Sequence, residues 1–173
     1  MWALILFVII YLFLLWLIYS RFFGAEYFPT SRKVAKQAIT MLKLNKRDVF
    51  YDLGCGGGAV VFLAEKISKC KAIGIEVDFL RWLYAFFKGK IIGSKAKFIF
   101  GSYNQHNTNN ATAIFVFLKQ GTNQKLKKKF LKLKKGTKII SYMHTFDNWK
   151  PVRVDKKNKL ALYILGKSER FKS

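Results

Sequence analysis

A run of glycines between a strand pattern and a helix pattern is the feature that most constrains the fold of this chain. The strand pattern covers residues 49–53, the glycine loop (residues 54–58, Gly-Cys-Gly-Gly-Gly) follows at once, and an apolar helix pattern covers 59–67. Glycine lets the backbone turn sharply and approach a ligand without Cβ collisions. The first turn of the following helix presents free N–H groups. A glycine loop in this setting predicts an α/β domain with a ligand at that turn.

The remaining segments alternate between strand and helix patterns. Strands separated by helical stretches of this size predict a mainly parallel sheet with helices on both faces. Further helices are predicted over 31–42, 78–88 and 123–133, and further strands over 71–76, 96–100, 112–118 and 137–143. Two last segments, around 152–154 and 160–165, predict an antiparallel terminal hairpin. The expected fold class is therefore α/β, with a Rossmann-like sheet.

Two carboxylates bracket the glycine loop. Glu76 ends the second predicted strand, where a carboxylate can accept hydrogen bonds from ribose hydroxyls. Asp52 lies two residues before the first glycine, and burying it without a partner would cost several kcal/mol. The aminoacyl end of S-adenosylmethionine supplies a cationic partner. The pattern Gly54-x-Gly56-x-x-Ala59 also fits NAD or FAD domains. Those domains normally carry an apolar core residue at the position of Asp52, so S-adenosylmethionine is the favoured ligand.

Residues 2–19 form an uncharged apolar run that Arg21 ends. As a helix rising about 1.5 Å per residue, the run would be roughly 27 Å long, near the roughly 30 Å hydrocarbon thickness of a bilayer. Basic residues follow it and none precedes it, which by the positive-inside rule predicts a cytoplasmic catalytic domain. We therefore expect a single-pass membrane protein with a transmembrane anchor (1–21), a connector (22–30) and a methyltransferase domain (31–173). A cleaved signal peptide and a buried helix are the alternatives, and the first lacks a basic n-region and a cleavage site.

The net charge of +23 comes mostly from lysine. Binding to nucleic acid, apposition to an anionic membrane surface, and the codon bias of an AT-rich genome are three interpretations. Specific nucleic-acid recognition is the weakest, since no cluster of base-reading side chains is present. In the basic helix 123–133 we expect Leu126, Phe130 and Leu133 to face inward. Two cysteines and two histidines without metal-ligand spacing indicate no metal site.

Six short segments stand in a recognisable order along the chain. They are YFPTS (27–31), YDLGCGGG (51–58), GIE (74–76), FIFGS (98–102), KGTKIISY (135–142) and NWKP (148–151). The glycine loop with GIE behind it resembles the cofactor motifs of class I S-adenosylmethionine-dependent methyltransferases. The whole set resembles the protein-lysine methyltransferases that include the membrane-anchored ATP synthase c-subunit methyltransferase and its short archaeal relatives. The resemblance covers nearly the whole chain from residue 27.

The resemblance assigns each part of the cofactor to residues of this chain. The methionine part would be held by Asp52, Gly54, Gly56 and Gly58. Glu76 would bind the ribose, Val77 would pack against the adenine, and Thr30 would close over the cofactor from the N-terminal side. Two positions depart from the pattern. Ser102 stands where many relatives have Asn or Asp near the adenine amino group, and Gly57 replaces an acidic or polar residue.

The acceptor side is predicted from the segment after the fifth strand. Tyr142, His144 and Trp149 are candidates for an acceptor channel, because aromatic faces attract an amine. Packing of the terminal hairpin is the alternative role for these side chains. An Asn/Asp-Pro-Pro-Tyr motif, used on planar amide and adenine nitrogens, is absent at the end of the fourth strand.

The expected function is methyl transfer from S-adenosylmethionine to lysine side chains of a membrane-associated protein. A lysine must lose its proton first, and a desolvated, electropositive site would lower its pKa without a dedicated base. The alternatives are a phospholipid methyltransferase, an RNA methyltransferase and a catalytically silent scaffold that binds the cofactor.

Overall fold

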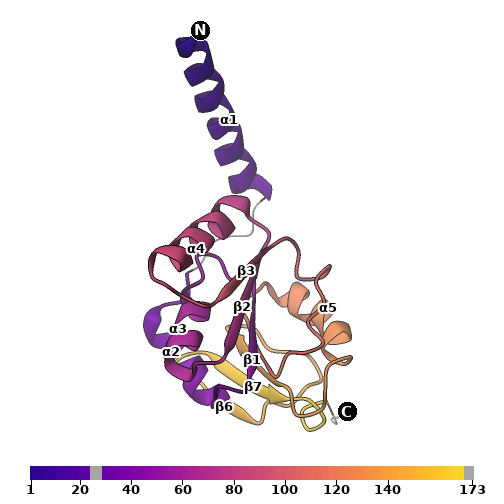
Figure 1. Cartoon of the computed structure of the whole chain (residues 1–173). Helices are drawn as coiled ribbons and strands as arrows, with labels where there is room; N and C mark the ends of the chain where they lie inside the picture. The colour runs from indigo at the N-terminus through magenta and orange to yellow at the C-terminus, as the bar shows by residue number, and fades with distance from the viewer. Residues whose placement is uncertain (24–28, 170–173) are drawn as a thin grey trace.

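The computed structural model describes residues 1–23 and 29–169 of the 173-residue chain. Helices and strands alternate along most of its length (Figure 1). The helices are α1 (Trp2–Phe23), α2 (Arg32–Leu42), α3 (Ala59–Ser68), α4 (Phe79–Ile91) and α5 (Gln120–Phe130). The strands are β1 (Val49–Leu53), β2 (Lys71–Glu76), β3 (Lys97–Phe100), β4 (Ala113–Val116), β5 (Lys138–Tyr142), β6 (Arg153–Asp155) and β7 (Leu160–Ile164).

The strands form one seven-stranded sheet in the order β3-β2-β1-β4-β5-β7-β6. Strands β1 to β5 pair in parallel, and β7 pairs antiparallel with both β5 and β6. The predicted Rossmann-like sheet with a terminal hairpin is confirmed. The chain runs outward from β1 to β3 and then returns to β4. The order therefore reverses between β1 and β4, and in open α/β sheets ligands bind at such a switch point, beyond the carboxyl ends of the strands.

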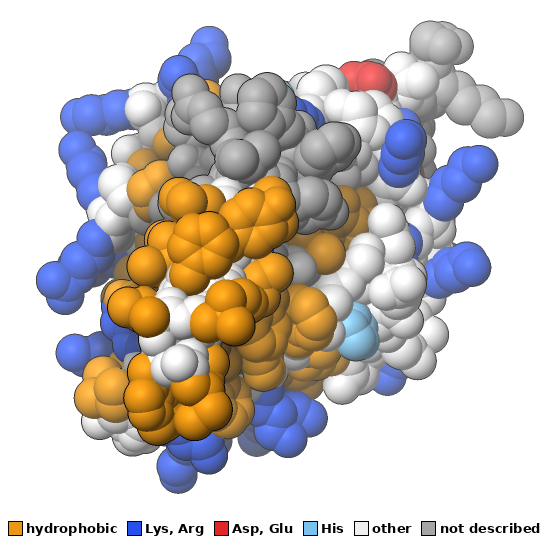
Figure 2. All heavy atoms as spheres, turned by 90° about the horizontal axis from the view of Figure 1, so that it is seen from above, with side chains coloured by type: hydrophobic (Ala, Val, Ile, Leu, Met, Phe, Trp, Pro, Cys, Tyr) orange, Lys and Arg blue, Asp and Glu red, His pale blue; other side chains and the backbone are white. Residues whose placement is uncertain are grey.

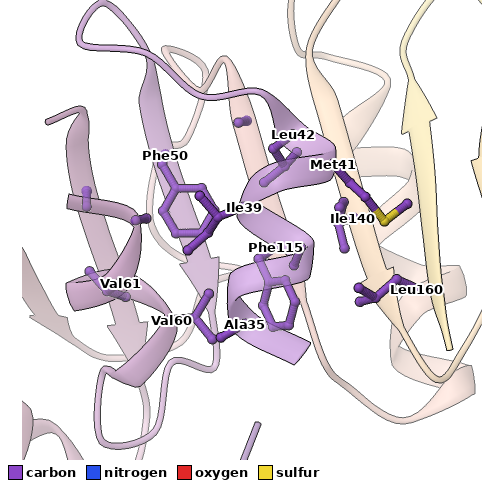
Figure 3. Packing of buried hydrophobic residues seen from close by; sticks show 14 of the residues in the cluster. Ala35, Ile39, Met41, Leu42, Phe50, Val60, Val61, Phe115, Ile140 and Leu160 are labelled. Atoms are coloured by element: carbon purple, nitrogen blue, oxygen red, sulfur yellow. The ribbon is translucent and has the colours of Figure 1, made fainter. Parts of the chain in front are cut away.

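The sheet lies between two layers of helices. Helices α2, α3 and α4 lie on one face and α5 lies on the other (Figure 1). Successive strand residues point to opposite faces, so Phe50 and Phe115 pack toward α2 and α3 while Tyr51 and Ile114 pack toward α5. Figure 3 shows the first of these clusters, in which apolar side chains of α2 and α3 meet those of β1, β4 and β5.

Helix ends follow the caps that the sequence indicates. The Ser31 hydroxyl accepts the Val34 N–H at 3.3 Å, and the Asp78 carboxylate accepts the Arg81 N–H at 3.0 Å. Both side chains satisfy N–H groups that the first helical turn leaves unpaired.

Helix α5 departs from the prediction, because it begins at Gln120 and ends at Phe130 instead of covering 123–133. Side chains in its first two turns bond to the segment after β5, and these long-range contacts fix its start. The inward positions are confirmed, since Leu126, Phe130 and Leu133 are buried.

The N-terminal helix corrects a second prediction. Within residues 1–23 and 29–169, no helix combines the length and apolarity that a membrane crossing needs. The transmembrane anchor over 1–21, the single-pass membrane location and the cytoplasmic placement derived from it are therefore wrong. Most of the connector expected over 22–30 lies outside the described residues.

Candidate active site

A cavity of about 380 Å³ lies at the switch point of the sheet. Residues at or after the carboxyl ends of β1, β2, β3, β4 and β5 form its wall, together with Pro29 and Thr30 from the segment before α2. Topology brings these six segments together although they are spread over more than a hundred residues of sequence. In the described part of the chain, no group of three or more His, Cys, Asp or Glu side chains could hold a metal ion.

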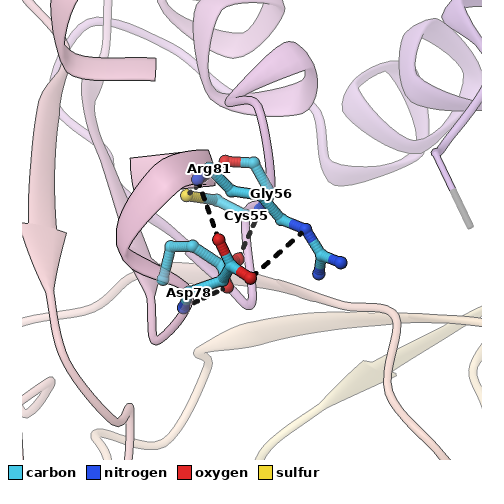
Figure 4. A network of polar contacts seen from close by, with 5 residues as sticks. Cys55, Gly56, Asp78 and Arg81 are labelled. Atoms are coloured by element: carbon cyan, nitrogen blue, oxygen red, sulfur yellow. Dashed lines mark hydrogen bonds and ion pairs between the residues drawn. The ribbon is translucent and has the colours of Figure 1, made fainter. Parts of the chain in front are cut away.

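Glu76 is fixed beside the glycine loop by two backbone donors. The N–H of Gly56 donates to Oε2 at 2.7 Å, and the N–H of Asp78 donates to Oε1 at 2.9 Å. Asp78 also caps α4 and lies 3.9 Å from Nε of Arg81, so loop, carboxylate and helix form one network (Figure 4). Each carboxylate oxygen has a second lone pair. Glu76 can therefore accept ribose hydroxyls while the loop holds it in place.

The glycine loop itself lies tightly against β2. The N–H groups of Gly54 and Cys55 both donate to the Ile75 carbonyl, at 2.9 and 3.1 Å. Gly74 makes this approach possible, because a Cβ at that position would lie 2.6 Å from Sγ of Cys55. In the sequence this glycine stood out only as part of the GIE segment (74–76). The structure shows that it leaves room for the loop.

Asp52 is a buried carboxylate without a cationic partner among the described residues. It lines the cavity and is only 3% exposed. Burial, and secondly the charge of Glu76, raise the pKa of the Asp52 carboxyl well above its ordinary value. Among the described residues its carboxylate makes no hydrogen bond or ion pair that would offset this cost. Such a group favours a cationic ligand, and the ammonium and sulfonium groups of S-adenosylmethionine meet that requirement.

Cys55 shares this environment. The pKa of the Cys55 thiol is raised well above its usual range, mainly by burial and further by the charges of Asp52 and Glu76. The thiol is therefore protonated at neutral pH and serves as packing material.

The predicted cofactor residues are mostly brought together. The cavity is lined by Thr30, Asp52, Gly54, Gly56, Glu76 and Val77. Gly58 and Ser102 do not line it. Gly58 instead is the N-cap residue of α3, with a positive φ of 76°, and a Cβ there would lie 2.6 Å from the ring of Phe98. Tyr103, the residue after Ser102, contributes to the wall in its place.

The predicted acceptor residues separate into three positions. His144 lines the cavity. Tyr142 lies one layer behind, with its ring centroid 4.4 Å from that of Phe117, which does line the cavity. Trp149 is buried in the core and packs against Phe146 with ring centroids 5.3 Å apart. Of the three, only His144 is placed to contact a ligand directly.

Several wall residues escaped the sequence analysis. They are Tyr103, Phe115, Phe117, Lys119 and Met143. Phe115 and Phe117 carried a signal, since they alternate along a strand that ends at the switch point. Lys119 and Met143 carried none, because they reach the cavity only through the packing of α5 and the turn after β5.

The pairing of a ribose-binding carboxylate with a second, buried acid that needs a cation fits S-adenosylmethionine, and the molecule is accordingly an S-adenosylmethionine-dependent methyltransferase. More narrowly, the chain belongs to the ANTKMT methyltransferase domain family, which it matches over residues 52–153. A second family, histone methylation protein DOT1, matches residues 17–81.

Individual proteins agree with this assignment. A protein-lysine N-methyltransferase of Saccharolobus islandicus (strain REY15A) is 30% identical over 150 residues, which cover 81% of this chain and 93% of the relative. An RNA methyltransferase from Salinibacter ruber, solved with S-adenosyl-L-homocysteine, superposes with a TM-score of 0.77 at 26% identity, covering 84% of this chain and 97% of that one. A methyltransferase from Pyrococcus furiosus shares the fold, with a TM-score of 0.60 at 18% identity over 87% of this chain and 93% of that one.

Proposed function

We propose that this enzyme transfers the methyl group of S-adenosylmethionine to lysine side chains of proteins. The similarity to the Saccharolobus islandicus protein-lysine N-methyltransferase, which extends over nearly that whole relative, carries the proposal. The cavity supports it, because its wall includes the apolar and aromatic side chains of Phe115, Phe117 and Met143. Such a wall suits the hydrocarbon stem of a lysine.

The chemistry requires little more than alignment. When bound, S-adenosylmethionine supplies an electrophilic methyl group on a positively charged sulfur. The lysine nitrogen forms the new C–N bond with its lone pair as the S–C bond breaks, S-adenosylhomocysteine leaves, and the proton goes to solvent. The residues of this chain hold and orient the reactants and exclude water. Asp52 and Glu76 hold the cofactor in this scheme.

The acceptor lysine must be neutral before it reacts, and its unperturbed pKa is about 10.4. Apolar walls and the strongly positive chain both disfavour the protonated form of the acceptor lysine, so both lower its pKa. We assign the acceptor side to His144, while Tyr142 and Trp149 contribute by packing against Phe117 and Phe146. No dedicated base is needed.

The net charge of +23 also selects the substrate. A chain this basic repels basic partners and attracts acidic ones. We therefore expect lysines of acidic proteins to be methylated in preference to those of basic proteins.

The test is to incubate the purified chain with methyl-labelled S-adenosylmethionine and a protein extract, and to follow the label by mass spectrometry. Methylated lysine in acidic proteins is the expected product, with Asp52→Asn as the inactive control. Label found only in lipid or RNA would refute the proposal. Cofactor binding without any turnover would indicate the scaffold alternative.

RNA is a second candidate acceptor, favoured by the similarity to the Salinibacter ruber RNA methyltransferase and by the basic composition. The same incubation separates the two candidates. Label that survives protease and disappears with ribonuclease would establish RNA as the acceptor.

A further inference from the structure

The segment after β5 enters the cavity in an unusual conformation. Met143 and His144 line the cavity, and Met143 has a positive φ of 66°. A residue other than glycine is uncommon in that region and persists where the surrounding structure holds it. We name residues 143–147 the acceptor loop. What holds this loop determines the geometry on the acceptor side.

The inner support is a buried chain of three polar groups. The amide Nδ2 of Asn123 on α5 donates to Oγ of Ser141 at 2.9 Å, and the Ser141 hydroxyl donates to the carbonyl of His144. Nδ2 of Asn123 also lies 3.4 Å from that carbonyl. Asn123 is fully buried and Ser141 is 1% exposed. Hydrogen bonds in such a low-dielectric setting reinforce one another.

Three further side chains of α5 support the outside of the loop. Nε2 of Gln124 donates to the Thr145 carbonyl at 3.1 Å, and Oε1 of the same residue accepts the Asp147 N–H at 3.0 Å. Nζ of Lys127 donates to the Asp147 carbonyl at 2.5 Å, and Nε2 of Gln120 donates to the Asp147 carboxylate at 3.1 Å. Helix α5 thus supports the carbonyls of His144, Thr145 and Asp147, while the N–H groups of Met143 and Phe146 donate to the Lys159 carbonyl and the Tyr163 hydroxyl.

Asn123 lowers the stability of the core position that it occupies. Its Oδ1 is buried and has no hydrogen-bond partner in the described part of the chain. An unpaired buried acceptor lowers stability by about 1–3 kcal/mol, so a well-packed apolar residue would suit folding better. A buried polar group with this cost calls for an explanation. Placement of the His144 carbonyl supplies one.

We infer that Asn123 and Ser141 are positioning residues for methyl transfer. They act through the backbone of the acceptor loop and hold His144 and Met143 where the incoming amine meets the methyl group in line. The inference rests on the proposed function, because it assigns the acceptor to this side of the cavity. Neither residue lines the cavity, so neither contacts the cofactor.

The matched variants are Ser141→Ala and Thr137→Val. Both remove a buried hydroxyl at an end of β5 with little change in shape. The Thr137 hydroxyl, however, lies at the end of β5 remote from the cavity, 2.7 Å from the Lys134 carbonyl and 3.2 Å from the Ala111 carbonyl. Asn123→Leu removes the amide at similar volume.

Ser141→Ala and Asn123→Leu are expected to lower kcat about ten- to hundred-fold, the cost of a misplacement of about 1 Å, and to change the Kd for S-adenosylmethionine less than two-fold. Thr137→Val should lose comparable thermal stability and keep its kcat. The double variant should be no worse than the poorer single one, because both act through one network. Equal kcat losses in Ser141→Ala and Thr137→Val would overturn the inference, as would cofactor affinity falling in step with kcat.

A second readout needs no catalysis. The chain has only two histidines, so comparison with His106→Gln assigns the imidazole NMR signal of His144. This signal should shift in Ser141→Ala and in Asn123→Leu and stay fixed in Thr137→Val. A fixed signal in all three refutes the positioning role. Shifted signals without lysine methylation would instead refute the proposed function alone.

Discussion

Asp52 shows how one side chain can oppose folding and serve binding. The cofactor-free chain must bury this carboxylate until it is only 3% exposed, near the charge of Glu76. Its raised pKa means that the folded state holds the proton more tightly than the unfolded state, whose Asp pKa is about 3.9. By linkage, ionisation of Asp52 therefore lowers stability as the pH rises from about 4 through the raised pKa.

Asp52→Asn removes this cost, since an amide cannot ionise. We expect the cofactor-free variant to melt at a higher temperature than the wild type at pH 8. The two should melt alike near pH 4, where the wild-type carboxyl is protonated. Thermal unfolding at the two pH values measures the effect, and a variant less stable than the wild type at pH 8 would show that Asp52 already has a partner in the free chain.

Gly74 provides a second prediction for a single residue. A Cβ there would lie 2.6 Å from Sγ and 2.9 Å from Cβ of Cys55, so Gly74→Ala must push the glycine loop off β2. Overpacking of this kind costs about 1–3 kcal/mol, and the displaced loop should also bind S-adenosylmethionine more weakly. Gly121→Ala is the control, because nothing lies within 4 Å of a Cβ at that helical position, and it should be neutral or stabilising. Equal behaviour of the two variants in denaturant unfolding and cofactor titration would contradict the prediction.

At the scale of the element, α5 links both rims of the cavity. Its polar face bonds the acceptor loop on one side. On the other, Nζ of Lys129 donates to the carbonyl of Tyr103 and, at 2.6 Å, to that of His106. Desolvation lowers the pKa of this lysine, in keeping with its half-buried position. A helix that composition marks as a solvated basic face therefore contains individual lysines with structural roles.

Lys129→Met is expected to loosen the loop that carries Tyr103 into the cavity wall. The variant should lose about 1 kcal/mol of stability, because two partly buried carbonyls lose their donor, and should bind S-adenosylmethionine several-fold more weakly. Lys128→Met is the control, since the neighbouring Lys128 is exposed. Isothermal titration of both variants decides the matter, and identical affinities would leave Lys129 without a role at the site.

Local features of the fold and of the cavity could be predicted from the sequence, whereas features set by long-range contacts could not. Strands β1 and β2 were located to the residue, because apolar runs and flanking glycines are local signals. The start of α5 was missed by three residues, because bonds from Gln120 and Gln124 to a loop more than 20 residues away fix it. At the site, the glycine loop, Asp52 and Glu76 form a local motif and were predictable. Tyr103, Lys119 and Met143 arrive by topology, and a sequence pattern cannot bring them together.

The apolar run at the N-terminus marks another limit of prediction from sequence. Its composition indicated a membrane span, yet the described part of the chain contains no helix able to cross a membrane. The side chains of residues 4–15 in α1 that are large and apolar are exposed. Composition alone therefore did not determine the role of this helix.

At the scale of the whole molecule, the chain carries far more basic than acidic side chains. Lysine and arginine side chains ring the face seen from above in Figure 2, where acidic side chains are nearly absent. With a net charge of +23, the long-range field steers acidic partners toward the molecule. This field is screened by salt, whereas contacts inside the cavity are screened much less.

We therefore expect the KM for an acidic protein substrate to rise several-fold with ionic strength. A change from about 0.01 M to about 0.15 M shortens the Debye length from about 30 Å to about 8 Å. The kcat at saturation should hold constant, because chemistry occurs in the shielded cavity. A neutral peptide with the same acceptor lysine is the control, and equal salt dependence for both substrates would show that charge does not select the partner.

Cofactor binding depends most on the two carboxylates that hold a cationic nucleoside across the glycine loop. Isothermal titration of S-adenosylmethionine into the wild-type chain, Asp52→Asn and Glu76→Gln tests this directly. The wild type should bind, and each variant should bind at least about ten-fold more weakly, the loss of about 1.4 kcal/mol that a single charge-assisted contact supplies. Wild-type affinity in the Asp52→Asn variant would contradict the cofactor site described above.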